Sequence, residues 1–335
     1  MAKMTILGAG SWGTSLSVLL SGNGHEVTVW SCFPEEVDML ERLREHKDKL
    51  PGVLVPANVR FTGNLKEAVS GAEQVVLVVP SQTIRQNARA VALMLEPEAI
   101  LVCCSKGLEE ATGMRLSAVI SSEVPDHRVV GLYGPSHAEE VAIGIPTTVV
   151  AASPDREAAE AVQDAFMGPT FRVYTSSDLV GAEIGSALKN VIALCAGICD
   201  GLGFGDNSKA ALMTRGITEI ARLGTALGGN AKTFSGLTGI GDLIVTCTSR
   251  HSRNWNAGYL IGQGATLQEA TDKVRMVVEG VSAARAARKL SEQTGVSMPI
   301  ADEAYRILFE KKNAMEAVRD LMTRSRKHES EEAGW

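Results

Sequence analysis

The chain has 335 residues, of which 45% are hydrophobic and 21% are charged, and its formal net charge is −6. This length predicts two domains with a substantial core each, and an acidic balance with few aromatic residues argues against a nucleic-acid-binding surface. No uninterrupted apolar run reaches the length of a membrane span, and the first residues read as a strand and not as a secretory signal, so we expect a cytoplasmic protein with a small ligand.

The first elements in the chain have the order strand, glycine turn, helix. A short apolar strand at residues 4–7 leads directly into Gly8-Ala-Gly10-Ser11-Trp12-Gly13, and a helix at 14–20 and a second strand at 26–30 follow. A GxGxxG sequence is a weak signal by itself, but this context is the one that a dinucleotide-binding site requires.

Each glycine of this turn has its own function. Gly8 allows the tight turn, Gly10 lets a pyrophosphate approach the backbone, and Gly13 lets the helix pack close to the strand. The N-terminus of the helix then binds the phosphates. The turn therefore predicts NAD or NADP as cofactor.

The end of the second strand usually indicates which of the two is bound, because an acid there binds the ribose of NAD and an arginine binds the extra phosphate of NADP. Ser31 and Cys32 stand at this point, and the first acids, Glu35 and Glu36, are expected to begin the next helix. With no carboxylate to repel a phosphate, the pattern leans towards NADP, but the preference stays open.

Further apolar strands follow at residues 74–79, 99–104, 129–133 and 147–151, with helical segments such as 82–95 between them. Nearly continuous apolar runs are typical of parallel strands covered on both faces. We therefore predict an α/β fold with a doubly wound, Rossmann-type, largely parallel sheet over residues 1–180. Ligands of such sheets bind at the carboxyl ends of the strands, where the loops at 79–82, 105–109 and 134–140 lie.

From residue 181 to 325 the pattern predicts an all-helical domain, followed by a polar tail at 326–335. Its helices are expected at 208–227, 267–272, 281–294 and 300–309, with glycine-rich or polar loops at 201–207, 236–242 and 246–254. The last of these loops contains Arg250 and Arg253, which suit a phosphate dianion. A solvated turn is the alternative interpretation of this loop.

Lys189 is the only charged residue in an otherwise apolar or small-residue run from 184 to 198. Its helical neighbours offer no carboxylate within one turn, and a buried, unpaired ammonium is costly. Burial would lower its pKa and suit it to proton transfer with a substrate oxygen. A lysine that reaches solvent or pairs with a distant carboxylate is the alternative.

The six cysteines match no disulfide or zinc-binding spacing. Cys103 and Cys104 are adjacent in a predicted strand, while Cys195 and Cys199 share the helix of Lys189. We expect small buried side chains in a reduced cytosolic protein and no structural metal.

These motifs together resemble those of bacterial NAD(P)-dependent glycerol-3-phosphate dehydrogenases, over residues 3 to 325. The resemblance rests on the glycine turn with Trp12 and on Ser105-Lys106-Gly107, Gly134-Pro-Ser136-x-Ala138, Ala187-Leu-Lys189-Asn190, Gly239-x-Gly-Asp242, Ser252-Arg253-Asn254 and Val277-x-Glu279-Gly280. It implies reversible hydride transfer between the cofactor and C2 of dihydroxyacetone phosphate, which gives sn-glycerol 3-phosphate for phospholipid synthesis. A homodimer is also implied, with no interface that one sequence identifies.

The resemblance also implies a role for each residue. Lys189 would be the proton donor in reduction and the acceptor in oxidation, Lys106 would hold substrate, and Asp242 would orient Lys189 or bind substrate hydroxyls. Substrate contacts are implied for Lys106, Gly134, Ser136, Lys189, Asp242, Ser252, Arg253 and Asn254. Cofactor contacts are implied for Gly8, Gly10, Ser11, Trp12, Gly13, Cys32, Lys106, Ala138, Arg253, Val277 and Glu279.

Two positions depart from the family pattern. Many relatives have an arginine near Cys32, so the contact with the NADP phosphate does not simply carry over. His137 stands where the family often has phenylalanine, and a histidine there could compete as acid or base.

Two other functions stay open at this stage. A 6-phosphogluconate-type or hydroxyacid dehydrogenase shares the dinucleotide domain and the helical lysine, but the loops at 236–242 and 246–254 argue against it. A non-catalytic NADP-binding regulator would be expected to lack Lys189 or Asp242.

Overall fold

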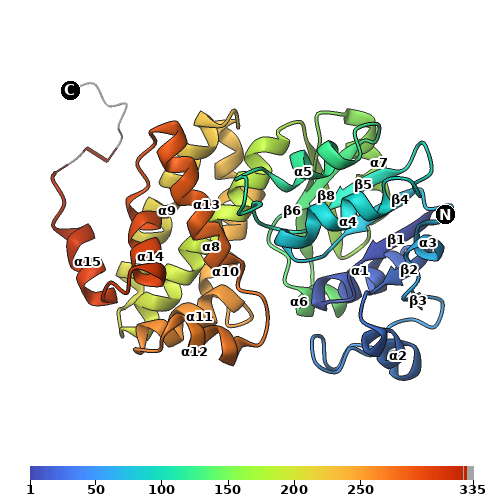
Figure 1. Ribbon diagram of the computed structural model, residues 1–335, viewed down its shortest axis with the longest axis horizontal. Helices are drawn as coiled ribbons and strands as arrows, with labels where there is room; N and C mark the ends of the chain where they lie inside the picture. Colours follow the sequence, from blue (N-terminus) through green and yellow to red (C-terminus); the bar gives the residue numbers. More distant parts are fainter. Residues whose placement is uncertain (327, 330–335) are drawn as a thin grey trace.

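The computed structural model describes residues 1–326, 328 and 329. An α/β part and a helical part lie side by side, and α8 (Leu179–Gly201) begins where the sheet ends (Figure 1). The predicted boundary at residue 180 falls in the first turn of this helix.

The sheet has eight strands in the order β3-β2-β1-β4-β5-β6-β7-β8. Their bounds are β1 (Lys3–Leu7), β2 (Glu26–Trp30), β3 (Arg60–Thr62), β4 (Gln74–Leu77), β5 (Ile100–Cys103), β6 (Val129–Tyr133), β7 (Thr147–Ala152) and β8 (Phe171–Ser176). All neighbours are parallel except β6 and β7. Strands β2 and β3 are added on one side of β1, and β4 and the later strands are added on its other side. A doubly wound sheet binds its ligand at such a switch point, which here lies between β1 and β4.

Two of these strands were missing from the prediction. β3 and β8 are the edges of the sheet, and neither has a long apolar run: β3 has only three residues, and β8 alternates buried with exposed side chains. The direction of β7 was also not foreseeable, because an apolar run buried on both faces fits either orientation.

Helices cover both faces of the sheet. They are α1 (Ser11–Gly22), α2 (Pro34–Leu43), α3 (Leu65–Val69), α4 (Ile84–Val91), α5 (Leu116–Glu123), α6 (Ala138–Ala142) and α7 (Arg156–Phe166), with a 3₁₀ turn at Ser81–Thr83. Leu16 of α1 and Phe166 of α7 belong to one core, and Ile84 of α4 and Val119 of α5 belong to the other. This is the doubly wound arrangement that the sequence predicts.

The helical part is built around α8, whose residues from Gly181 to Ile198 are all buried. This helix is long and apolar enough to span a membrane, but 89% of its most apolar window is buried inside the protein. It packs against α9 (Asp206–Ala226), α10 (Asp242–Thr248), α11 (Arg253–Gly262) and α13 (Glu279–Thr294). The apolar composition of α8 is therefore explained by its position in the core of the protein.

Two of the predicted loops are mostly helical. Residues Leu237–Gly241 form a π-helical turn that runs into α10, and the predicted loop at 246–254 is reduced to Ser249–Ser252 because α10 ends at Thr248 and α11 begins at Arg253. Glycine and hydroxyl residues favour turns in sequence-based reasoning, and here packing against α8 overrides that preference.

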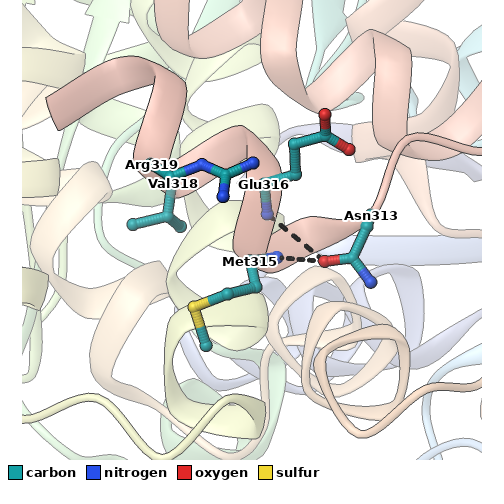
Figure 2. A pocket seen from close by; sticks show the side chains of 5 residues that line it. All are labelled: Asn313, Met315, Glu316, Val318 and Arg319. Carbon is teal, nitrogen blue, oxygen red and sulfur yellow. Dashed lines mark hydrogen bonds between the residues drawn. The ribbon is translucent and has the colours of Figure 1, made fainter. Parts of the chain in front are cut away.

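The remaining helices are α12 (Leu267–Val274), α14 (Pro299–Phe309) and α15 (Ala314–Met322), with a 3₁₀ turn at Ala231–Ser235. The side-chain oxygen of Asn313 caps α15 by accepting from the backbone N–H groups of Met315 and Glu316 (Figure 2). Of the predicted tail at 326–335, residues 327 and 330–335 lie outside the described residues, and Arg326, His328 and Glu329 are in neither helix nor strand.

Candidate active site

The glycine turn between β1 and α1 fits the pyrophosphate of a dinucleotide. Gly8 has φ +114°, and a Cβ at Gly13 would lie 1.9 Å from the carbonyl oxygen of Gly8. A Cβ at Gly10 would meet nothing within 4 Å, so open space adjoins the backbone at this residue. The N-cap of α1 is Gly10, which contributes no side-chain cap, so the first N–H groups of α1 are free to bind phosphate.

Neighbouring residues shape one wall of this turn. The Ser11 hydroxyl donates to the carbonyl of Lys49 at 2.6 Å, and the half-buried Trp12 packs with Leu50 and Ala138. The predicted cofactor residues Ser11, Trp12 and Ala138 therefore lie together, and the segment around Lys49 joins them.

The end of β2 holds a carboxylate that sequence reasoning assigned only to the following helix. Glu36 does lie in α2, but its side chain turns back and accepts from the Ser31 hydroxyl at 2.7 Å. Lys49 and His46 also contact it. Although burial favours the neutral acid, the nearby His46 ring and the hydrogen bonds from Lys49 and Ser31 lower the pKa of Glu36 to about 2.

This finding removes the argument that favoured NADP. A carboxylate does stand beside Ser31, and it is paired with a lysine. Cys32 is exposed in the next position of the chain. The end of β2 therefore presents both charges, and the residues here fit either cofactor.

One carboxylate joins two lysines, one from each part of the chain. Asp242, at the start of α10, accepts from Lys189 of α8 at 2.6 Å and from Lys106 of the loop after β5 at 2.8 Å. Asp242 is 1% exposed and Lys189 is 4% exposed. The ion pair that the helix of Lys189 does not supply thus comes from another helix, and it links the two parts of the chain.

The ammonium of Lys189 has one N–H left after its internal contacts. It donates to Asp242 and, at 2.6 Å, to the hydroxyl of Thr246, while a lysine has three donors. Burial lowers its pKa to about 8, although the Asp242 carboxylate favours the charged form. A proton held this way is poised for transfer near neutral pH.

Thr246 was not among the predicted site residues. Its hydroxyl accepts from Lys189 and donates to the carbonyl of Asp242 at 2.6 Å. The spacing of four residues between Asp242 and Thr246 places both on one side of a helix. That signal could have been used only if residues 242–248 had been predicted as helical.

Lys106 is held against the loop that follows β6. Its ammonium donates to the carbonyl of Gly134 at 2.8 Å, and the Ser136 hydroxyl donates to the same carbonyl at 2.9 Å. Both the loop of Lys106 and the loop of Gly134 follow strands that end at the same edge of the sheet. The structure brings these predicted substrate residues together with Lys189 and Asp242.

The predicted phosphate-binding sequence forms the N-terminus of α11. Ser252 is the N-cap, and its hydroxyl accepts from the N–H of Trp255. The Asn254 amide is also engaged, since it donates to Asn190 at 3.0 Å and accepts from the N–H of Gly280 at 2.8 Å. What remains to bind an anion is Arg253 with the first backbone N–H groups of the helix. The Arg253 residue is exposed, although the atoms around its guanidinium lower the pKa of that group by burial.

A second contact crosses between the two parts of the chain near the cofactor turn. Glu279, at the start of α13, accepts from the Ser81 hydroxyl at 2.5 Å and from the Ser81 N–H at 3.1 Å. Val277 beside it is 47% exposed. Ser81 was not predicted as a site residue, and it explains how Glu279 of the helical part is held over the loop after β4.

His137 lies close to the lysines. Its Nε2 donates to the carbonyl of Val245 at a long 3.5 Å, and burial together with the Lys189 charge lowers its pKa below 6.5. A neutral imidazole that points towards a carbonyl is a poorer proton donor than Lys189. The geometry therefore favours Lys189 over the alternative acid considered above.

Two hollows on the surface of the described residues lie away from this cluster. One of about 360 Å³ is lined by residues of α15 and its cap (Figure 2), and α15 projects at the far end of the helical part (Figure 1). A second contains Glu110, Arg285 and Lys289 among its lining residues. Neither contains a residue of the lysine and aspartate cluster.

The chain matches the two parts of one protein family. Residues 3–159 match "NAD-dependent glycerol-3-phosphate dehydrogenase N-terminus", and residues 178–319 match "NAD-dependent glycerol-3-phosphate dehydrogenase C-terminus". The second match begins at residue 178, which is the N-cap position of α8.

Curated relatives and a solved structure match this chain over nearly its whole length. A glycerol-3-phosphate dehydrogenase [NAD(P)+] of Desulfitobacterium hafniense is 54% identical over 332 residues, which are 99% of this chain and 94% of the relative. The protein of that name from Agathobacter rectalis is 53% identical over the full length of both. The crystal structure of glycerol-3-phosphate dehydrogenase from Coxiella burnetii has a TM-score of 0.93 at 33% identity, and the match covers 96% of this chain and 99% of that one.

Proposed function

The chain belongs to the NAD-dependent glycerol-3-phosphate dehydrogenase family and is an NAD(P)-dependent oxidoreductase acting on a CH–OH group; we propose that it reduces dihydroxyacetone phosphate at C2 with Lys189 as the proton donor. The observation that carries this proposal is the buried Asp242 bridge between Lys189 and Lys106. This bridge holds two ammonium groups ready to stabilise the negative charge that the carbonyl oxygen of the substrate acquires during reduction.

Lys189 acts on the C2 oxygen of the substrate. Two of its N–H groups are fixed by Asp242 and Thr246, so the third is directed by the geometry that they impose. The bound nicotinamide supplies the hydride for C2. As the oxygen gains charge, Nζ of Lys189 gives it a proton and becomes a neutral amine, and in the oxidative direction the neutral amine takes the proton from the hydroxyl.

Lys106 and Asp242 support this step without donating the proton. Asp242 keeps the Lys189 ammonium charged against the penalty of burial, and Lys106 holds the Gly134 loop by its hydrogen bond. The free N–H of Lys106 is available to the substrate oxygens. Both lysines are thereby preorganised before substrate binds.

The phosphate end of the substrate binds at the N-terminus of α11. Arg253 contributes a guanidinium, and the helix contributes backbone N–H groups and its dipole. The Ser252 and Asn254 side chains keep this turn in place through their contacts with Trp255 and Asn190, so these two residues bind phosphate through the backbone.

The residues of the glycine turn would hold the pyrophosphate of NAD or NADP, namely Gly8, Gly10, Ser11, Trp12 and Gly13. Cys32, Ala138, Val277 and Glu279 would make further cofactor contacts, and the bound nicotinamide would supply the hydride. The hydrogen bonds between Glu279 and Ser81 support a role for the helical part in holding the cofactor. The paired Glu36 and Lys49 beside Ser31 suit either NAD or NADP.

We place this reaction in the cytoplasm, where it supplies sn-glycerol 3-phosphate for glycerophospholipid synthesis, and we propose a homodimer on the family resemblance. All six cysteines are free thiols, which suits a reducing compartment. Light scattering of the purified protein tests the dimer, and a monomer mass at micromolar concentration would refute it.

The assay that tests the function follows NADH and NADPH oxidation separately with dihydroxyacetone phosphate, and uses dihydroxyacetone as the unphosphorylated control. Turnover that needs the phosphate is expected with at least one of the two cofactors. Equal rates with dihydroxyacetone phosphate and dihydroxyacetone would contradict the proposed phosphate site at α11. Absence of turnover would favour a related dehydrogenase or a non-catalytic regulator.

A further inference from the structure

Two histidines, one from each part of the chain, meet beside the proposed substrate site. His137 follows Ser136 in the loop after β6, and His251 precedes the N-cap Ser252 of α11. Their ring centroids are 5.8 Å apart, with an interplanar angle of 50°. Each ring is thus adjacent in sequence to a residue proposed to bind substrate.

We propose that His251 is a further phosphate-binding residue, which donates as an imidazolium to the phosphate monoester dianion at the N-terminus of α11 while the His137 ring holds it in position. This inference rests on the proposed function, because it concerns the same phosphate. It assigns His251 to substrate recognition and His137 to positioning.

The groups around the pair determine which ring carries the charge. Lys189 of α8 and Lys106 lie near His137, while Glu139 of α6 partly offsets them. Burial is the largest influence and lowers the pKa of His137, and the Lys189 charge acts in the same direction, although the hydrogen bond from Nε2 to the carbonyl of Val245 on α10 opposes them. These effects favour the neutral His137 ring, which does not repel a protonated neighbour. We therefore assign His137 to positioning and His251 to the contact with the phosphate.

The surroundings of Arg253 are consistent with a shared phosphate. Burial lowers the pKa of Arg253, and the carboxylates of Glu279 and Glu139 oppose this effect. Arg250 is exposed in the same turn, and Asp242 is already engaged by two lysines. His251 is exposed, and its backbone N–H donates to Ser249 at 3.1 Å, which fixes the turn that carries the ring. An imidazole beside a bound dianion is stabilised in its protonated form.

The alternative is that the ring contact only packs the two loops together. The variant His251→Phe separates the two ideas, because it keeps an aromatic ring against His137 and removes the N–H donor. His137→Phe is the matched control, since it keeps the ring on the other side and leaves His251 intact. His251→Gln retains an amide donor that does not titrate.

The test measures KM for dihydroxyacetone phosphate with saturating NADH or NADPH, at pH 6.5 and at pH 8.5, on the full-length variants. His251→Phe is expected to raise KM about tenfold at pH 6.5 and less than twofold at pH 8.5, with kcat nearly unchanged. His137→Phe is expected to change KM less than threefold, and His251→Gln to show a smaller, pH-independent increase. Ionisation of the substrate phosphate affects all variants alike, so the ratio of each KM to that of the unaltered enzyme isolates the imidazole.

Two outcomes would overturn the proposal: a KM for His251→Phe equal to that of the unaltered enzyme at both pH values, or an equal increase in both phenylalanine variants. The second outcome would assign the pair to packing. If the unaltered enzyme shows no turnover, the proposed function fails, and NMR of the imidazole protons with added inorganic phosphate then decides the inference. Downfield shifts assigned to His251, absent from His251→Gln, support it, and no shift refutes it.

Discussion

The substitution Asp242→Asn removes one negative charge that two lysines share and keeps the shape of the side chain. Asp242 accepts from Lys189 at 2.6 Å and from Lys106 at 2.8 Å, and it is 1% exposed. In the variant, Lys189 keeps the cost of burial and the repulsion from Lys106, but it loses the charge that opposes them. Its pKa must therefore fall.

The size of the fall follows from the distance. Two unit charges separated by 2.6 Å attract by about 1.6 kcal/mol even at the dielectric constant of water, and a pKa unit corresponds to about 1.4 kcal/mol. The pKa of Lys189, about 8 in the unaltered protein, is thus expected to fall by about one unit or more. Most Lys189 side chains would then be neutral at pH 7.5, and reduction would lose its proton donor.

The assay is kcat/KM for dihydroxyacetone phosphate reduction and for glycerol 3-phosphate oxidation from pH 6 to pH 9.5. Because reduction needs the ammonium and oxidation needs the amine, the two profiles should bend near the same pH, and both bends should move to lower pH in Asp242→Asn. Thr246→Val is the matched control, since it removes a hydrogen bond to Lys189 and leaves the ion pair. Bends that stay within about 0.3 units of their original pH, in a variant that is folded by circular dichroism, would refute the reasoning.

Three other predictions concern separate features. Arg253→Ala should raise KM for dihydroxyacetone phosphate about 10- to 100-fold, as expected for a lost hydrogen-bonded ion pair to phosphate, and an unchanged KM would contradict the phosphate assignment. Cys32→Arg should increase the ratio of kcat/KM for NADPH to that for NADH about tenfold, whereas an unchanged ratio would show that this exposed position does not face the ribose. Burial raises the pKa of Glu219 from 4.5 to about 7, although hydrogen bonds from the N–H groups of Ile300 and Ala301 act in the opposite direction. The contribution of Glu219 to stability is therefore present below pH 4.5 and is lost as pH rises through 7. Urea unfolding at pH 5 and pH 8 should therefore show a loss of up to about 3 kcal/mol that Glu219→Gln does not share, and equal pH dependence in both proteins would refute this.

The fold was predictable where local pattern and tertiary environment agree. A doubly wound sheet is indicated by the glycine turn before α1 and by the apolar runs at β1, β2, β4, β5 and β6. The helical part is indicated near residue 180, where alternating strands and helices give way to helices alone. Edge strands such as β8 escape this reasoning because they are only half-buried. The segment 237–248 also escapes it, because contacts with α8 make helical a sequence that favours turns.

The candidate site was predictable in its residue types but not in its pairings. An isolated charge at Lys189 requires a partner, yet nothing local says that Asp242 supplies it from 53 positions away. The same holds for the return of Glu36 to Ser31 and for the contact of Glu279 with Ser81. Side chains that are distant in sequence meet only through the packing of whole elements, which a single sequence does not display.

The proposed mechanism depends on proton transfer from Lys189 to the substrate. The most direct measurement is kcat of Lys189→Ala with dihydroxyacetone phosphate, without and with added methylamine, alongside NADPH binding followed by its fluorescence. We expect kcat to fall at least about 100-fold, cofactor binding to stay within about threefold, and methylamine to restore part of the rate because an amine can occupy the space that the side chain leaves. A variant that retains its full kcat would contradict the claim.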